Sequence, residues 1–171
     1  MNVYRRFVQI FRQKNLYVSS KKFILKGVLK SFSFIIDMKG RESMNKFDIY
    51  KMILEIISEK NPKDFQELLD DAQKYQIVKD YIASDNPNQF LIQDLQDYVI
   101  SMVNDGLIAG IISPLKYVTL IKINGLTIEG FQYLKKMKED DVEKEVKAIL
   151  DSNNQPVNPK TLTSALSSLI F

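Results

Sequence analysis

The chain has 171 residues, 45% of them hydrophobic, which is enough to bury the core of one ordinary domain with appendages. It contains no cysteine and no histidine, which excludes a disulfide framework, the usual zinc sites and a catalytic triad that uses histidine. No apolar run approaches the roughly 20 residues that a membrane-spanning helix needs, so we expect no membrane span and a cytoplasmic protein.

The net charge of +3 is divided unevenly along the chain. Residues 1–43 hold ten Lys/Arg and two acids, including all four arginines, whereas residues 44–171 hold fourteen lysines and nineteen acids. The chain therefore has a basic N-terminal extension followed by an acidic remainder.

Three interpretations of the extension are open. The first is that residues 1–43 are not translated in the natural protein or are disordered. We favour this interpretation because a helix pattern opens directly at Met44, as it would after a start codon. The codons for residues 39–42 can also spell a purine-rich ribosome-binding sequence ahead of Met44. Alternatively it lies on a membrane surface, since Val3 and Phe7 share a helical face flanked by arginines. The third interpretation is a basic arm that binds nucleic acid.

The domain begins with a strong helix over Phe47–Ser58. Apolar residues fill most of its circumference, which predicts a central helix packed on several sides. Its one narrow polar stripe consists of Asp48, Lys51, Glu55 and Glu59. We expect Asn61-Pro62 to end this helix and to cap the next one. Beyond Tyr75 the apolar spacing drifts, which predicts a kink or two short helices before a turn at residues 85–88.

The stretch Gln93–Met137 organises the rest of the chain. A helix over Gln93–Asn104 is stopped at Gly106, a residue suited to the left-handed conformation. Two apolar runs, Leu107–Ile112 and Tyr117–Ile123, predict a β-hairpin joined by a proline-containing turn. Asn124-Gly125 is expected to end the second strand.

A further helix follows, for which Thr127 is the predicted N-cap. It should turn Phe131, Leu134 and Met137 inward. Gly130 within it costs about 1 kcal/mol relative to alanine, and a close approach of helix to strand would explain that choice.

Two more helices are predicted after this one. An amphipathic helix runs through Leu150, and Asn158-Pro159 caps the last helix. We therefore expect a mainly α fold with a small β-hairpin (α+β), namely a winged helix-turn-helix over 44–138 with a C-terminal helical extension over 139–171.

Motifs of enzymatic chemistry are missing from the sequence. It has neither a glycine-rich dinucleotide fingerprint nor a phosphate-binding loop. Its acid clusters are those of solvated helix faces. We expect no enzyme activity, no cofactor and no metal site.

The helix before the hairpin of a winged helix enters the DNA major groove, and the wing contacts the backbone. The predicted outward face of that helix consists of Gln93, Gln96, Asp97, Ile100, Ser101 and Asn104. The candidate wing residues are Lys116, Tyr117 and Lys122. Glutamine and asparagine can read adenine, but the helix has no cation, and DNA affinity depends largely on Lys and Arg. An outward Ile100 suits a protein surface better.

The segment NDGLIAGIISPLKYVTLIKINGLTIEGFQYLKKM resembles the YjcQ-like family of small winged-helix proteins from low-GC Gram-positive bacteria and their prophages. The resemblance rests on residues 105–108, on the strand pair, and on residues 126–130 with Tyr133-Leu134. It covers roughly residues 44–150 and implies the fold and a loose association with phage or regulatory genes, but no activity.

Two functions follow as hypotheses. The first is a non-enzymatic regulatory or interaction module that contacts a partner protein. The alternative is a sequence-specific DNA-binding transcriptional regulator. Neither implies a small-molecule substrate, and a homodimer through the C-terminal helices is compatible with both.

Overall fold

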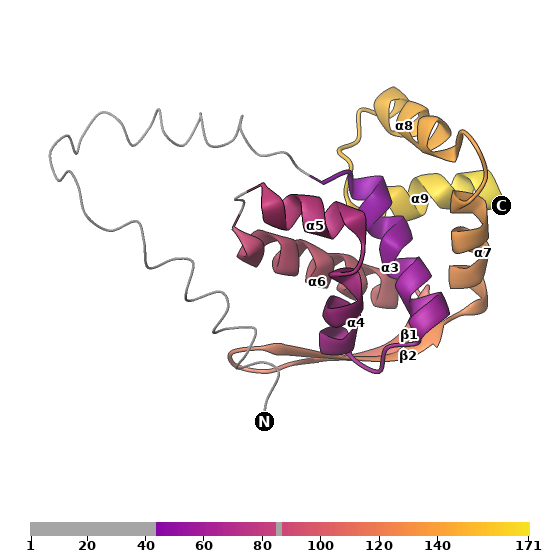
Figure 1. Cartoon of the computed structure of the whole chain (residues 1–171). Helices are drawn as coiled ribbons and strands as arrows, with labels where there is room; N and C mark the ends of the chain where they lie inside the picture. The colour runs from indigo at the N-terminus through magenta and orange to yellow at the C-terminus, as the bar shows by residue number, and fades with distance from the viewer. Residues whose placement is uncertain (1–43, 85–86) are drawn as a thin grey trace, which may run out of the picture. The chain divides into compact units, whose positions relative to one another are not determined.

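The structure is a computed structural model that describes residues 44–84 and 87–171 (Figure 1). The three interpretations of residues 1–43 lie outside the described residues, as do the first two positions of the turn expected at 85–88. The described ranges fold into seven α-helices and one antiparallel β-hairpin, as the α+β class predicts. In chain order the elements are α3 (Lys46–Lys60), α4 (Phe65–Ala72), α5 (Gln76–Ala83), α6 (Asn88–Asn104), β1 (Ile108–Pro114), β2 (Thr119–Leu126), α7 (Ile128–Met137), α8 (Val142–Ser152) and α9 (Pro159–Ile170).

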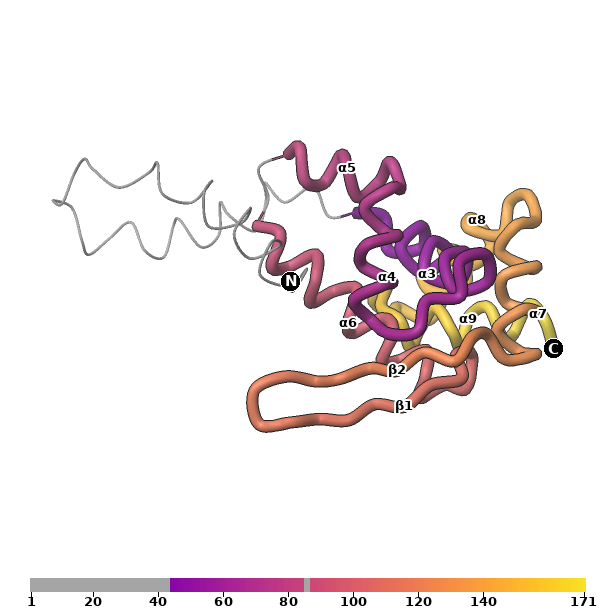
Figure 2. The backbone as a smooth tube through the Cα atoms, turned by 60° about the horizontal axis from the view of Figure 1, so that its bottom comes forward, coloured from indigo at the N-terminus to yellow at the C-terminus, as the bar shows by residue number. Residues whose placement is uncertain are grey.

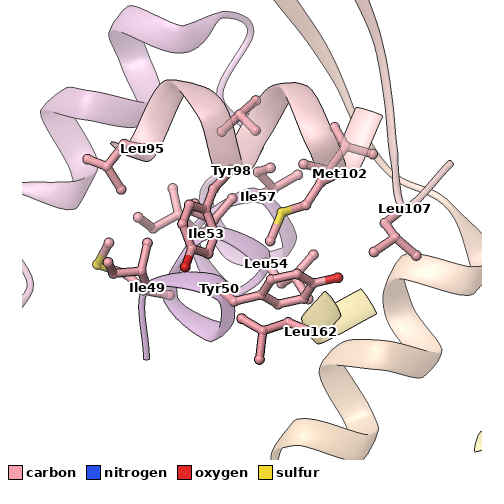
Figure 3. Close-up of a cluster of buried hydrophobic side chains, with 14 of the residues drawn as sticks. Ile49, Tyr50, Ile53, Leu54, Ile57, Leu95, Tyr98, Met102, Leu107 and Leu162 are labelled. Carbon is pink, nitrogen blue, oxygen red and sulfur yellow. The ribbon is translucent and has the colours of Figure 1, made fainter. Parts of the chain in front are cut away.

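Helix α3 is the central element of the core, as its apolar circumference predicts. Its start is capped by the Asn45 side chain, which accepts a hydrogen bond from the backbone N–H of Phe47 at 3.1 Å. It contacts α4, α6, α7, α9 and β2, and Figure 3 shows its side chains meeting those of α6 together with Leu107 and Leu162. Eight of its residues are buried: Phe47, Ile49, Tyr50, Met52, Ile53, Leu54, Ile56 and Ile57.

Tyr50 joins three helices at the middle of this core. Its hydroxyl group forms a hydrogen bond of 2.9 Å with the Thr163 hydroxyl of α9. Its ring meets the ring of Tyr98 from α6 edge to face, with centroids 6.3 Å apart. Burial raises the pKa of Tyr50 far above its ordinary value, since the core disfavours the charged phenolate.

Asn61 ends helix α3 as predicted, but the next helix does not start there. Asn61 takes a left-handed conformation with φ of 49° and caps the end of α3 instead of starting the next helix. Helix α4 begins at Phe65, where the Asp64 side chain accepts a hydrogen bond from the N–H of Glu67 at 2.9 Å. The predicted break near Tyr75 is confirmed, because α4 and α5 are two short helices.

The segment between α3 and α4 ties the hairpin to the helical core. The N–H of Ile123 in β2 donates to the carbonyl of Lys63 at 2.9 Å. Asp64 and Lys122 form an isolated antiparallel bridge at the same place. The second strand is thereby held beside the end of α3.

The hairpin is present where the sequence predicts it, but Asn124-Gly125 does not end its second strand. Strand β2 continues to Leu126, which pairs with Ile108. The register shifts between Ala109 and Gly110, and Gly125 accommodates this with φ of 117°, a conformation that glycine adopts at little steric cost.

Thr127 caps α7, as predicted, and joins that helix to the start of the hairpin. Its hydroxyl accepts from the N–H of Gly130 at 3.0 Å, and its own N–H donates to the Leu107 carbonyl at 3.0 Å. A Cβ atom on Gly130 would overlap the same Leu107 carbonyl oxygen, so the close approach inferred for this glycine is confirmed. The prediction that Phe131 points inward is wrong, because this residue is 51% exposed and Tyr133 is buried instead.

The last two helices, α8 and α9, complete the core by packing on one another and on α7. Asn158 and Thr161 form a reciprocal capping box at the start of α9. Helix α9 contacts α3, α6, α7 and α8. Residues 139–171 therefore pack onto the helices of residues 44–138.

Gly130→Ala tests the contact between α7 and the hairpin. In an exposed helix this change stabilises by about 1 kcal/mol, but here the added methyl group displaces the Leu107 carbonyl. We expect a net loss of about 1–3 kcal/mol in the free energy of unfolding, measured by urea titration. Gln132→Ala, on the exposed face of the same helix, is the control and should change stability little. A more stable Gly130→Ala protein would contradict the proposed contact.

Candidate functional site

Helix α6 buries one face and leaves the other accessible, as the predicted recognition helix requires. Its buried residues are Leu91, Leu95, Tyr98, Val99 and Met102. Of the six candidate residues, Gln93, Asp97 and Asn104 are exposed, whereas Gln96, Ile100 and Ser101 are half-buried.

Ile100 departs from its expected place. Its side chain packs against the hydrophobic core, so it is not the exposed apolar contact that its sequence position predicts. The buried face of α6 extends far enough round the helix to include part of Ile100, the neighbour of the buried Val99. The case for a protein-binding surface therefore cannot rest on Ile100.

The outward face of α6 is polar and carries negative charge. The Gln93 amide donates to the Asp97 carboxylate at 2.9 Å, and the Ser101 hydroxyl donates to Asp105 at 3.3 Å. These pairs stand four residues apart, the spacing at which helical side chains meet. The polar groups are thus paired along the helix, and the sequence Asn88–Asn104 contains no Lys or Arg.

The hairpin has one face on the core and one face in solvent. Side chains alternate between the two faces of a strand, and the inner face includes Ile121 and Ile123, both buried. The outer face carries Ile111 opposite Lys122 and Leu120 opposite Ser113. Ile111 is 56% exposed and Leu120 is 54% exposed.

The tip of the hairpin is also apolar. The Leu115 N–H donates to the Val118 carbonyl at 2.8 Å and closes the turn. Tyr117 is 87% exposed, and the Lys116 ammonium lies 5.2 Å from the centre of its ring, a distance typical of a cation–π contact. Figure 2 shows that this closed end lies far from α7, which follows directly after the second strand.

The exposed apolar side chains of the described residues are concentrated on this hairpin. Ten large hydrophobic residues are exposed, and five of them belong to the hairpin. We call these five the hairpin patch: Ile111, Leu115, Tyr117, Val118 and Leu120. Single exposed apolar residues are ordinary, whereas a group of them indicates an interaction site.

The three candidate wing residues lie within or beside this patch. Lys116 and Tyr117 are at the tip, and Lys122 is exposed on the outer face. The four other patch residues were not singled out from the sequence. The sequence nevertheless contains a signal for them in the adjacent apolar pairs Ile111-Ile112 and Leu120-Ile121, because a two-stranded hairpin on one core cannot bury both members of such pairs.

Two classes of site are not found in the described part of the chain. No group of three or more acidic side chains there is placed to hold a metal ion. None of the helices in residues 44–84 and 87–171 has both the length and the apolar character needed to cross a membrane.

No protein-family model, no curated protein and no solved structure matches the chain. The resemblance to the YjcQ-like family therefore stays a prediction from the sequence.

The two faces of the hairpin should differ in their importance for folding. Replacing Ile111 or Leu120 by serine should lower the free energy of unfolding by less than about 1 kcal/mol, since only cross-strand contacts are lost. Ile121→Ser, one residue from Leu120 in sequence, should lower it by about 2–5 kcal/mol because it empties a core position. Urea titrations of the three variants provide the comparison. Equal losses from both faces would show that the outer face is part of the core.

Proposed function

We propose that this chain is a non-enzymatic interaction module in which α3–α6 and the hairpin form a winged helix-turn-helix. The hairpin patch is the surface that contacts a partner protein. One observation carries the proposal, namely that half of the exposed large hydrophobic residues of the described chain lie on one hairpin that the core needs on its inner face only.

The order and pairing of the elements support the winged-helix arrangement. Four helices precede the hairpin, of which α4 and α5 are short, and α6 directly before it would be the recognition helix. The bridge between Asp64 and Lys122 places the segment after α3 beside the second hairpin strand, in the manner of a short third strand. A helix-turn-helix closed by a wing has this connectivity.

Electrostatics favour a protein partner over DNA. DNA binding gains most of its free energy from cations that replace phosphate counterions. Helix α6 contributes none, and Asp97 on its exposed face would repel phosphate. The hairpin patch, in contrast, offers the apolar and aromatic surface that the centres of protein interfaces require.

The kind of polar group in the core supports a non-enzymatic role. Within the described residues no charged residue is buried, and the polar groups that reach the core include the hydroxyls of Tyr50 and Tyr98. General acids and bases are most often imidazoles, carboxylates or amines, and the described core encloses none of these.

One observation favours the alternative, a sequence-specific DNA-binding regulator. Lys116 and Lys122 are both exposed on the hairpin, where the wing of a DNA-bound winged helix meets the phosphate backbone. Two phosphate contacts supply a small part of the salt-dependent affinity of a specific complex.

A DNA titration at two salt concentrations separates the two functions. We expect the full chain to show no sequence-specific DNA binding tighter than about 10 μM near physiological salt, because α6 lacks cations. Fluorescence anisotropy with a pool of duplexes measures this. Residues 1–43 are basic and can contribute to DNA affinity. The Lys116→Glu, Lys122→Glu double variant therefore measures how much of the DNA affinity comes from the hairpin. Tight binding with a steep salt slope that this variant abolishes would establish the DNA-binding alternative.

Quantitative affinity purification from the cells that express the chain tests the protein partner. The full chain should retain a defined protein in near-stoichiometric amount, and Ile111→Asp with Leu120→Asp should lose it by about tenfold or more. The matched control is Gln132→Asp with Lys135→Asp, on the exposed face of α7, and it should retain the partner. Equal recovery of the partner by the wild-type chain, the hairpin variant and the α7 control would show that the hairpin patch is not the contact surface.

A homodimer through the C-terminal helices is a secondary proposal. The apolar residues Leu162, Ala165 and Leu166 of α9 are buried within the chain, so they are not available to a second copy. Phe171 is 80% exposed and is the residue on which such a contact would centre. Sedimentation equilibrium of the wild-type chain and of Phe171→Ser tests it.

A further inference from the structure

A groove of about 750 Å³ opens between α3 and α5. One wall is the polar stripe of α3, and the other is α5 with the residues that lead into it. The hairpin is anchored past the opposite end of α3, at Lys63. The groove is therefore separate from the hairpin patch.

The lining of the groove combines three kinds of side chain. Met44 and Met52 are apolar, although Met52 is buried and only Met44 is half-exposed. Tyr75 and Tyr81 are aromatic, and Asp48, Glu55 and Asp80 are acidic. Methionines adapt to varied apolar partners, and tyrosine rings attract cations. The lining thus has an apolar part and a negative part side by side.

The negative charge of the groove is not balanced by its own lysine. Three carboxylates line it against the single ammonium group of Lys51. Within residues 44–84 and 87–171, neither Asp48 nor Glu55 takes part in an ion pair. Burial raises the pKa of Tyr75, and the nearby carboxylates of Glu55, Glu59 and Asp71 raise it further. Tyr75 therefore lies in a negative electrostatic environment.

We propose that this groove binds an amphipathic helical segment of a partner protein that carries Lys or Arg beside its apolar side chains. Charge complementarity identifies the occupant, because the α3 wall carries two carboxylates without an ion pair in the described residues, beside apolar and aromatic side chains. Asp48 and Glu55 are seven residues apart on α3, about 10 Å along the helix axis. Cations two turns apart on a partner helix have the same spacing, and its leucines or isoleucines would enter against the half-buried side chains of Met44, Tyr75 and Ile77.

The test uses a synthetic peptide of about 18 residues, composed of Leu and Lys so that the leucines share one helical face. Fluorescence anisotropy with the full chain near physiological salt should give saturable binding with a Kd of about 10 μM. A Leu/Glu peptide of the same pattern and a scrambled Leu/Lys peptide should bind at least about tenfold more weakly.

Variants connect the binding to the groove. The double variant Asp48→Lys, Glu55→Lys should raise the Kd of the Leu/Lys peptide by about tenfold or more. The matched control Glu145→Lys with Asp151→Lys makes the same change of charge on the exposed side of α8 and should alter the Kd by less than about twofold. Because Asp48 also favours the first turn of α3, Asp48→Asn with Glu55→Gln provides a milder pair, which should still weaken binding by about threefold.

Three results would overturn the proposal: no saturable binding, equal binding of the scrambled peptide, or equal weakening by the control reversal. The Asp48 and Glu55 variants leave the hairpin patch unchanged, so a failure of the groove proposal leaves the proposed function standing.

Discussion

The fold depends on covering one helix. Eight of the fifteen residues of α3 are buried, so its apolar surface extends round most of its circumference and no single neighbour can cover it. Helices α4, α6, α7 and α9 and strand β2 together do so. Each fully buried Ile or Leu there contributes about 1.5–3 kcal/mol, more than any surface ion pair of this chain can offer. The one side of α3 that escapes is its polar stripe, which becomes the wall of the acidic groove.

The hairpin follows a different constraint. It has two faces but only one core to cover, so Ile121 and Ile123 are buried while Ile111 and Leu120 stay in solvent. Folding gains little from the outer pair. An apolar outer face on a strand pair also invites association with other chains, a liability that is consistent with a role in binding.

The sequence was most informative where local chemistry decides the structure. The cap at Thr127, the close approach at Gly130 and the two-helix break near Tyr75 depend on neighbouring residues and on steric volume. It was least informative where distant pairing prevails over a local preference. Asn124-Gly125 has the composition of a turn, yet pairing with Ile108 and Ala109 extends β2 through it. Phe131 has helical spacing for burial, but the core is filled by Tyr133. The hairpin patch was missed because an apolar run in a strand does not say which face the core covers.

Hydroxyl-radical footprinting of the free chain tests most directly whether the hairpin patch is open. Three of the five patch residues are compared with a buried residue of the same type: Tyr117 with Tyr50, Leu120 with Leu54, and Ile111 with Ile121. Comparing like with like cancels the difference in chemical reactivity. We predict strong oxidation of Tyr117, Leu120 and Ile111, and protection of their three counterparts. Protection of Ile111 and Leu120 equal to that of Ile121 and Leu54, in a monomeric sample, would show that the chain covers its own hairpin and would contradict the account.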